Sequence, residues 1–149
     1  MARVSQMFDP LNRVSIDAII SPKSVGEREL AARHFFKLTV GDLILLDRGY
    51  PAYWLFNLIM SMGADFCARV STTKWKIIRK FVISGKREAI ISLPVFSSSI
   101  EKCKELGLEI SSLKLRLIRV ELDTGEVEVL ITSLIDKEVL PSGLFRELY

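Results

Sequence analysis

The feature that most constrains this chain is the stretch Asp42-Leu-Ile-Leu-Leu-Asp47-Arg-Gly-Tyr-Pro51. Leu43 to Leu46 form an apolar run with no polar alternation, which is typical of a central strand buried on both faces of a mixed or parallel sheet. Asp47 follows where this strand leaves the sheet, and open α/β folds place their binding sites at that edge. The stretch therefore predicts a candidate site at Asp47. The alternative is a turn-forming aspartate beside Gly49.

The residues around this strand predict a compact α/β unit. Polar and apolar residues alternate over 14–20, so Asp17 is expected on the solvent-exposed face of a strand. Ser24 and Glu27 match a capping box at the start of a helix. That helix carries His34, the only histidine, which we expect at the helix surface or in packing. The expected elements are an antiparallel hairpin of strands 1–8 and 14–20, a helix at 24–38, a strand at 42–46, a helix at 51–62 and a strand at 64–71.

The second half of the chain predicts a β-rich, antiparallel region. Ser84-Gly85 and Thr124-Gly125 are signals for hairpin turns. The alternation of apolar residues slips by one position within 113–122, which predicts a β-bulge near Leu117. The expected elements are strands at 76–84, 86–93, 113–122 and 126–134, a short helix at 97–106 and the first turns of a helix at 141–149.

Charge is distributed unevenly along the chain, although the net charge is only +3. Residues 74–119 hold 11 basic and 4 acidic side chains, and residues 120–149 hold 2 basic and 7 acidic ones. A basic segment of this kind can bind nucleic acid, but it can equally be the solvated face of a sheet. No apolar run reaches the roughly 18 residues of a membrane span. Cys67 and Cys103 lack the spacing of a metal site, so free thiols in the cytoplasm are expected.

Six segments share their order and spacing with a known family of enzymes. They are Ser5-Gln-Met-Phe-Asp-Pro-Leu-Asn12, Asp17-Ala-Ile-Ile-Ser-Pro22, Glu27-Arg-Glu-Leu-Ala31, Asp42 to Pro51, Gly63-Ala-Asp-Phe-Cys-Ala-Arg69 and Leu144-Phe-Arg-Glu-Leu-Tyr149. Together they resemble the DDE transposases of insertion-sequence family four. The resemblance covers almost the whole chain, and its last segment resembles the start of the family's helical signature, Y-x2-R-x3-E-x6-K.

The resemblance implies an α/β fold with a ribonuclease-H-like mixed-sheet core. Residues 1–71 correspond to part of that core, residues 72–140 to a β-rich insertion, and residues 141–149 to the start of the final catalytic helix. The family's chemistry implies three carboxylates that hold two Mg²⁺ ions for the cutting and joining of DNA. Asp47 matches the second of these carboxylates and is the expected catalytic and metal-binding residue.

The resemblance leaves the other two carboxylates without a counterpart. The first belongs on a strand before Met1 and the third lies seven residues beyond Tyr149, while Asp9 and Asp17 match neither. We therefore expect an incomplete core, and a transposase fragment that is inactive by itself. One alternative is a non-catalytic module that binds DNA or the full-length transposase. The other is an unrelated ribonuclease-H-like nuclease, which should carry more acidic residues at its strand ends.

Arg69 and Tyr149 lie where the family places contacts to transposon-end DNA. The alternatives are a salt bridge from Arg69 to Asp65 or Asp47, and packing of Tyr149 on the sheet. Self-association through the sheet edge left by the missing first strand is a further expectation. The expected partner is otherwise DNA, at transposon ends and target, in a bacterial cytoplasm and associated with the nucleoid. The candidate phosphate contacts in the insertion are Lys76, Arg79, Lys80, Lys114 and Arg116.

Overall fold

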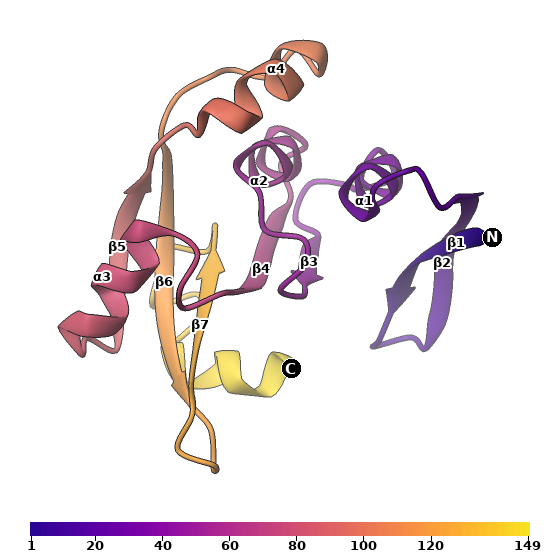
Figure 1. Ribbon diagram of the computed structural model, residues 1–149. Helices are drawn as coiled ribbons and strands as arrows, with labels where there is room; N and C mark the ends of the chain where they lie inside the picture. The colour runs from indigo at the N-terminus through magenta and orange to yellow at the C-terminus, as the bar shows by residue number, and fades with distance from the viewer.

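The computed structural model describes residues 1–149 and shows a mixed α/β protein with two separate sheets (Figure 1). The larger sheet has five strands in the order β3-β4-β7-β6-β5, and the smaller one is the β1-β2 hairpin. Only β3 and β4 are parallel. The elements are β1 (Ala2–Asp9), β2 (Val14–Pro22), α1 (Glu27–Phe35), β3 (Leu43–Leu46), α2 (Tyr53–Ser61), β4 (Asp65–Val70), α3 (Lys76–Ser84), β5 (Glu88–Leu93), α4 (Ser97–Glu105), β6 (Leu113–Glu121), β7 (Val127–Thr132) and the 3-10 helix η1 (Ser142–Leu148).

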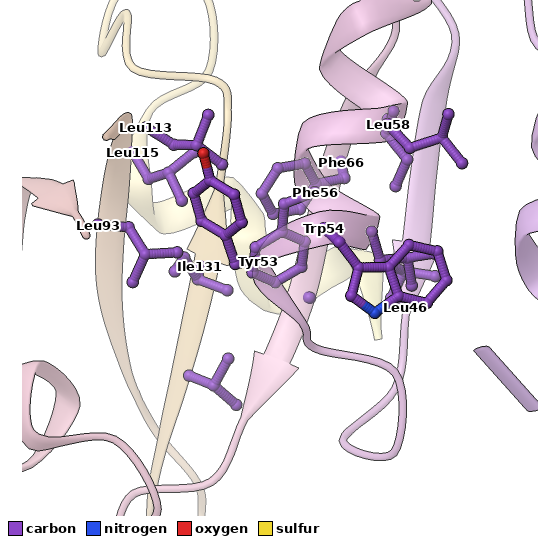
Figure 2. Close-up of a cluster of buried hydrophobic side chains, with 14 of the residues drawn as sticks. Leu46, Tyr53, Trp54, Phe56, Leu58, Phe66, Leu93, Leu113, Leu115 and Ile131 are labelled. Carbon is purple, nitrogen blue, oxygen red and sulfur yellow. The ribbon is translucent and has the colours of Figure 1, made fainter. Parts of the chain in front are cut away.

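The main core lies between the five-stranded sheet and α2, which α1 and α4 flank (Figure 1). The sequence of α2 is apolar on nearly every side, and the helix is accordingly buried over seven of its nine residues. Figure 2 shows how its aromatic side chains reach the sheet. The rings of Phe56 and Phe66 stack with centroids 4.1 Å apart, and both side chains are fully buried. Burial of side chains of this size is the main stabilising contribution to a domain.

A smaller cluster covers the opposite face of the sheet. Successive strand residues point to opposite faces, so Cys67 faces away from the side on which Phe66 packs. Cys67 belongs to this second cluster together with Ile118, Leu130 and Phe145 of η1. The C-terminal segment thus packs on the sheet, as a 3-10 helix rather than the expected α-helix.

The expected strand at 76–84 is wrong, because these residues form α3. Ile78 and Phe81 are buried three residues apart, which is a helical spacing, while the lysines and arginine between and beside them are exposed. Gly85 is not a hairpin turn. It ends α3 with φ 68°, the left-handed conformation common after a helix.

The expected central position of β3 is also wrong. β3 pairs only with β4 and forms an edge of the large sheet. Ile44 and Leu46 face the core, whereas Leu43 and Leu45 are 38% and 37% exposed. An apolar run does not distinguish a central strand from an edge strand whose second face is only partly covered.

Two local expectations differ from the structure as well. β6 pairs without interruption through Leu117, and the sheet irregularity lies instead in the hairpin between Met7 and Phe8, where Ile16 has no partner. Ser24 does not cap α1, because the N-cap is Gly26 and no side chain bonds the helix start. The expected turn at Thr124-Gly125 is confirmed, since Gly125 has φ 84° between β6 and β7.

The hairpin itself is confirmed, but its polarity is the reverse of the expected one. Ser5 and Asp17 face α1, where both bond the same helix residue. Arg3 on this face donates to the carbonyl of Val25 at 2.6 Å. The alternate positions are exposed and mostly apolar, including Ile20 at 75%, with Gln6 as the polar exception. The sequence pattern therefore predicts correctly that the two faces of the hairpin differ in polarity, but it does not predict which face is buried.

Candidate functional site

Asp47 lies at the carboxyl end of β3, as expected, and 70% of its side chain is exposed. Its Oδ1 accepts a hydrogen bond from the backbone N–H of Arg48 at 2.8 Å. Its carbonyl accepts one from Tyr50 at 3.0 Å and closes a turn. The turn-forming role is therefore present, and it leaves the second carboxylate oxygen, Oδ2, without a hydrogen bond.

Arg69 links Asp47 to the neighbouring strands. Its Nε is 3.7 Å from Oδ1 of Asp47, and its Nη1 is 3.4 Å from Oε1 of Glu128 on β7. Arg48 reaches the same Glu128 oxygen at 2.6 Å. Two acidic and two basic side chains thus alternate at the adjoining ends of β3, β4 and β7. The salt bridge expected between Arg69 and Asp47 is confirmed. Asp65 does not take part, since it accepts a hydrogen bond from Ser133 instead.

The contacts of Arg69 leave one polar atom unsatisfied. Its Nε is buried and has no hydrogen-bond partner. A buried donor without an acceptor costs about 1–3 kcal/mol. Oδ1 of Asp47 lies 3.7 Å from this Nε, which is beyond hydrogen-bond distance.

Tyr149 packs against this cluster from the C-terminal segment. Its hydroxyl lies 3.1 Å from the carbonyl of Leu46, the last residue of β3, and 2.7 Å from that of Cys67, within β4. Its ring lies 4.9 Å from the guanidinium carbon of Arg69, a cation–π contact. Burial raises the pKa of Tyr149, so the phenol stays protonated as a donor. Burial also raises the pKa of the Cys67 thiol to about 12. The packing alternative for Tyr149 is confirmed, while a contact with DNA stays a prediction.

Two shallow hollows flank the cluster. One, of about 230 Å³, is lined mainly by hydrophobic side chains, with Arg69, Arg146 and Glu128 as its charged members. The other, of about 350 Å³, lies between Arg48 and the Ser71–Thr72 turn. Glu128 lines both hollows and Glu126 lines the second, so acidic side chains offset the arginines and neither hollow is built for an anion.

The residues present do not form a magnesium site. Mg²⁺ takes oxygen ligands in near-octahedral geometry. Asp47 offers one carboxylate, and Glu128 of the same cluster is already bound by two arginines. No group of three His, Cys, Asp or Glu side chains is placed to hold a metal ion. Asp47 can supply one ligand, and the chain places no second carboxylate beside it.

The expected phosphate contacts fall into two groups. Lys76, Arg79 and Lys80 are exposed on α3, and Lys114 is exposed on β6. The expectation that Arg116 contacts phosphates at the surface is wrong, because this side chain is fully buried. The alternation of β6 places Arg116 correctly on one face with Lys114, but the C-terminal segment covers that face at Arg116.

Arg116 instead holds the C-terminal segment to the sheet. It bonds Oε2 of Glu88 at 2.7 Å and the carbonyl of Leu140 at 2.8 Å. Its guanidinium also lies 5.4 Å from the ring of Phe145. Nothing in the sequence distinguishes this arginine from its exposed neighbours, because both of its partners come from distant segments.

His34 joins α1 to the hairpin and is only 2% exposed, so the packing alternative is confirmed. Its Nδ1 lies 2.7 Å from Asp17, and its Nε2 lies 3.0 Å from the hydroxyl of Ser5. Asp17 also pairs with Lys37 at 2.7 Å. Serine, histidine and aspartate in this order form a nucleophilic triad in hydrolases. Here the imidazole is buried between α1 and the hairpin and is closed to a substrate. Its hydrogen bonds to Ser5 and Asp17 therefore have a structural role.

None of the helices is both long and apolar enough to cross a bilayer. In comparisons with known proteins, no family model, no curated protein and no solved structure matches this chain.

Proposed function

We propose that this chain is part of the catalytic domain of a DDE-type DNA transposase, and that by itself it binds DNA without cutting it. The observation that carries the proposal is the exposed Asp47 at the carboxyl end of β3, with Arg69 beside it. Both residues belong to segments whose order resembles that transposase family. Asp47 would supply one oxygen ligand to Mg²⁺, and the remaining carboxylates would not come from this chain.

The surface of α3 supports the DNA-binding half of the proposal. Residues 72–87 contain six lysines and arginines and no acidic residue. Lys76, Arg79 and Lys80 are exposed on α3 and form no salt bridge within the chain. Lys76 and Lys80 have no local partner and are free to neutralise phosphates, whereas Arg79 already donates to the carbonyls of Thr73 and Lys74. Trp75 at the start of α3 packs on Phe56 and Phe96, so stacking on a base is not its role in this structure.

Binding is tested by the dependence of DNA affinity on salt, measured by gel shift or fluorescence anisotropy. Each phosphate contact adds about 0.9 to the slope of log affinity against log salt for duplex DNA. The double variant Lys76→Gln/Lys80→Gln should lower the slope by about 2. Lys23→Gln, an exposed lysine in the turn between β2 and α1, is the control and should leave it unchanged. An affinity that does not depend on salt would contradict the binding proposal.

The absence of cutting is tested with supercoiled plasmid and Mg²⁺. The purified chain should leave the plasmid intact, because one carboxylate does not assemble a two-metal site. Nicking that disappears in Asp47→Ala would show that the chain completes its own site. Transposon-end DNA compared with random DNA of equal length then tests the transposase assignment, because preferential binding of the ends is expected only of a transposase segment.

A further inference from the structure

The turn that joins β6 to β7 is strongly acidic. Residues 121–128 contain four acidic side chains and no basic one. Val129 pairs with Val70, the last residue of β4, so residues 121–128 lie beyond the end of that strand. Figure 1 shows this turn projecting from the sheet. We call residues 121–128 the acidic arm.

Three arginines at the candidate site form ion pairs with the acidic arm. Arg48 and Arg69 both reach Oε1 of Glu128, at 2.6 and 3.4 Å. Arg146 lines the same hollow as Arg69, and it pairs with Asp123. Two carboxylates of the acidic arm thus neutralise arginines that come from three separate parts of the chain.

The lysines of α3 are in the opposite situation. Lys76 and Lys80 are exposed and form no salt bridge. A lysine without a partner can bind a phosphate directly, whereas an arginine held by a carboxylate must first exchange one acidic partner for another. The chain therefore presents the cations of α3 to DNA and keeps the arginines of the candidate site occupied.

We propose, on the basis of the proposed DNA binding, that the acidic arm is an autoinhibitory contact that keeps DNA away from the candidate site. Phosphate oxygens accept the same hydrogen bonds from arginine as carboxylates do, so the two compete for the same guanidinium groups. Carboxylates in place also repel phosphates by like charge. The arm can be displaced, because Arg48 and Arg146 are 59% and 53% exposed and exposed ion pairs contribute little to stability.

The dependence of DNA affinity on salt, measured by fluorescence anisotropy with a random duplex, tests this contact. Asp123→Asn frees Arg146 and should raise the slope of log affinity against log salt by about 0.9. Glu128→Gln frees two arginines and should raise the slope by about 1.8. Glu101→Gln is the matched control, because Glu101 is an exposed carboxylate on α4 without a salt bridge, and it should leave the slope unchanged.

A second substitution distinguishes the release of an arginine from a general change in charge. Arg146→Gln alone should leave the slope unchanged, because Asp123 already occupies this arginine. Added to Asp123→Asn, the same substitution should reverse the gain. Asp123 is 92% exposed, so its replacement does not disturb the fold. A slope that does not rise in Asp123→Asn, or a gain that survives Arg146→Gln, would overturn the proposal.

The results also distinguish this contact from the proposed function. Salt-dependent binding by the unchanged chain, with no gain in Asp123→Asn, would refute the autoinhibitory contact and leave DNA binding intact. Binding that is detected only in Asp123→Asn would support the contact and refute DNA binding by the unchanged chain. The absence of binding in every variant would refute both.

Discussion

The five-stranded sheet and the β1-β2 hairpin use the same kinds of residues in opposite ways. The sheet buries apolar side chains against α2, with Phe56 and Phe66 stacked at its centre. The hairpin attaches to the rest of the chain through polar groups, and its apolar face is exposed. Alternation along a strand therefore indicates that its two faces differ in polarity. Which of the two faces is buried depends on the element that packs against the strand.

The two regions should also differ in how they unfold. Apolar burial in the sheet involves many partners at once, so its loss is cooperative. The hairpin depends on a few directional hydrogen bonds around His34, which can break locally. The hairpin should therefore open at a lower free energy than the sheet, and the following changes test this difference.

The largest effect is expected for Phe56→Ala. The substitution removes a fully buried ring that stacks on Phe66, and it should lower the free energy of unfolding by about 3–5 kcal/mol. Urea denaturation followed by tryptophan fluorescence measures the change. Ile20→Ala in β2 is the matched apolar truncation, and because Ile20 is 75% exposed it should change stability by less than about 0.5 kcal/mol. Similar losses for the two variants would remove the contrast between the regions.

Arg116→Leu tests a polar contact inside the sheet region. The variant loses the hydrogen bonds to Glu88 and to the carbonyl of Leu140, and it should lose about 2–3 kcal/mol. Hydrogen exchange should then show faster exchange in η1 than in β7. Lys137→Gln is the control, because Lys137 contacts Glu88 from an exposed position and should matter little. If the amides of η1 exchanged at an unchanged rate, the packing of Phe145 alone would be sufficient to hold the C-terminal segment in place.

His34→Ala should have a smaller and local effect. It removes the link between Ser5 and Asp17, and it should cost about 1–2 kcal/mol of hairpin attachment. Amides of β1 and β2 should exchange faster while those of β6 and β7 keep their protection. His34→Gln, which retains hydrogen-bonding groups, should restore part of the protection. Equal loss in both sheets would mean that the two regions unfold as one unit.

The smallest effect is expected from acid. Hydrogen bonds from Lys37 and His34 lower the pKa of Asp17 below its usual range. A lowered pKa in the folded state means that the stabilisation is complete above about pH 4, the unfolded value, and is lost as the pH falls through the folded value. NMR signals of the hairpin should change over that window before those of the large sheet. Asp17→Asn should abolish the dependence, and its persistence would assign the transition to another carboxyl group.

Much of the fold follows from local sequence. The apolar composition of α2 predicts a buried helix, and Gly125 predicts a turn, because both features depend only on nearby residues. Residues 76–84 were expected to be a strand, although the spacing of Ile78 and Phe81 was a local signal for α3. The edge position of β3 depends on which distant strands pair, and a local pattern contains no such information.

The candidate site was predictable only in part, because some of its contacts also depend on the pairing of distant strands. The contact between Asp47 and Arg69 follows from strand ends that adjoin in a parallel pair. Glu128 lies 80 positions from Arg48 and joins the cluster only because β7 pairs with β4. The burial of Arg116 likewise requires the C-terminal segment to return to β6.

The pairing of β7 with β4 also constrains the order of folding. The parallel pair β3-β4 can form from residues that are close in sequence, but β4 completes its second edge only with residues 127–132. Between them the chain forms β5 and β6, which pair with each other and then with β7 as consecutive antiparallel strands. Contacts of such long sequence separation slow folding, and an open strand edge promotes association in the meantime. During synthesis β4 must therefore keep one edge unpaired until the last strand leaves the ribosome.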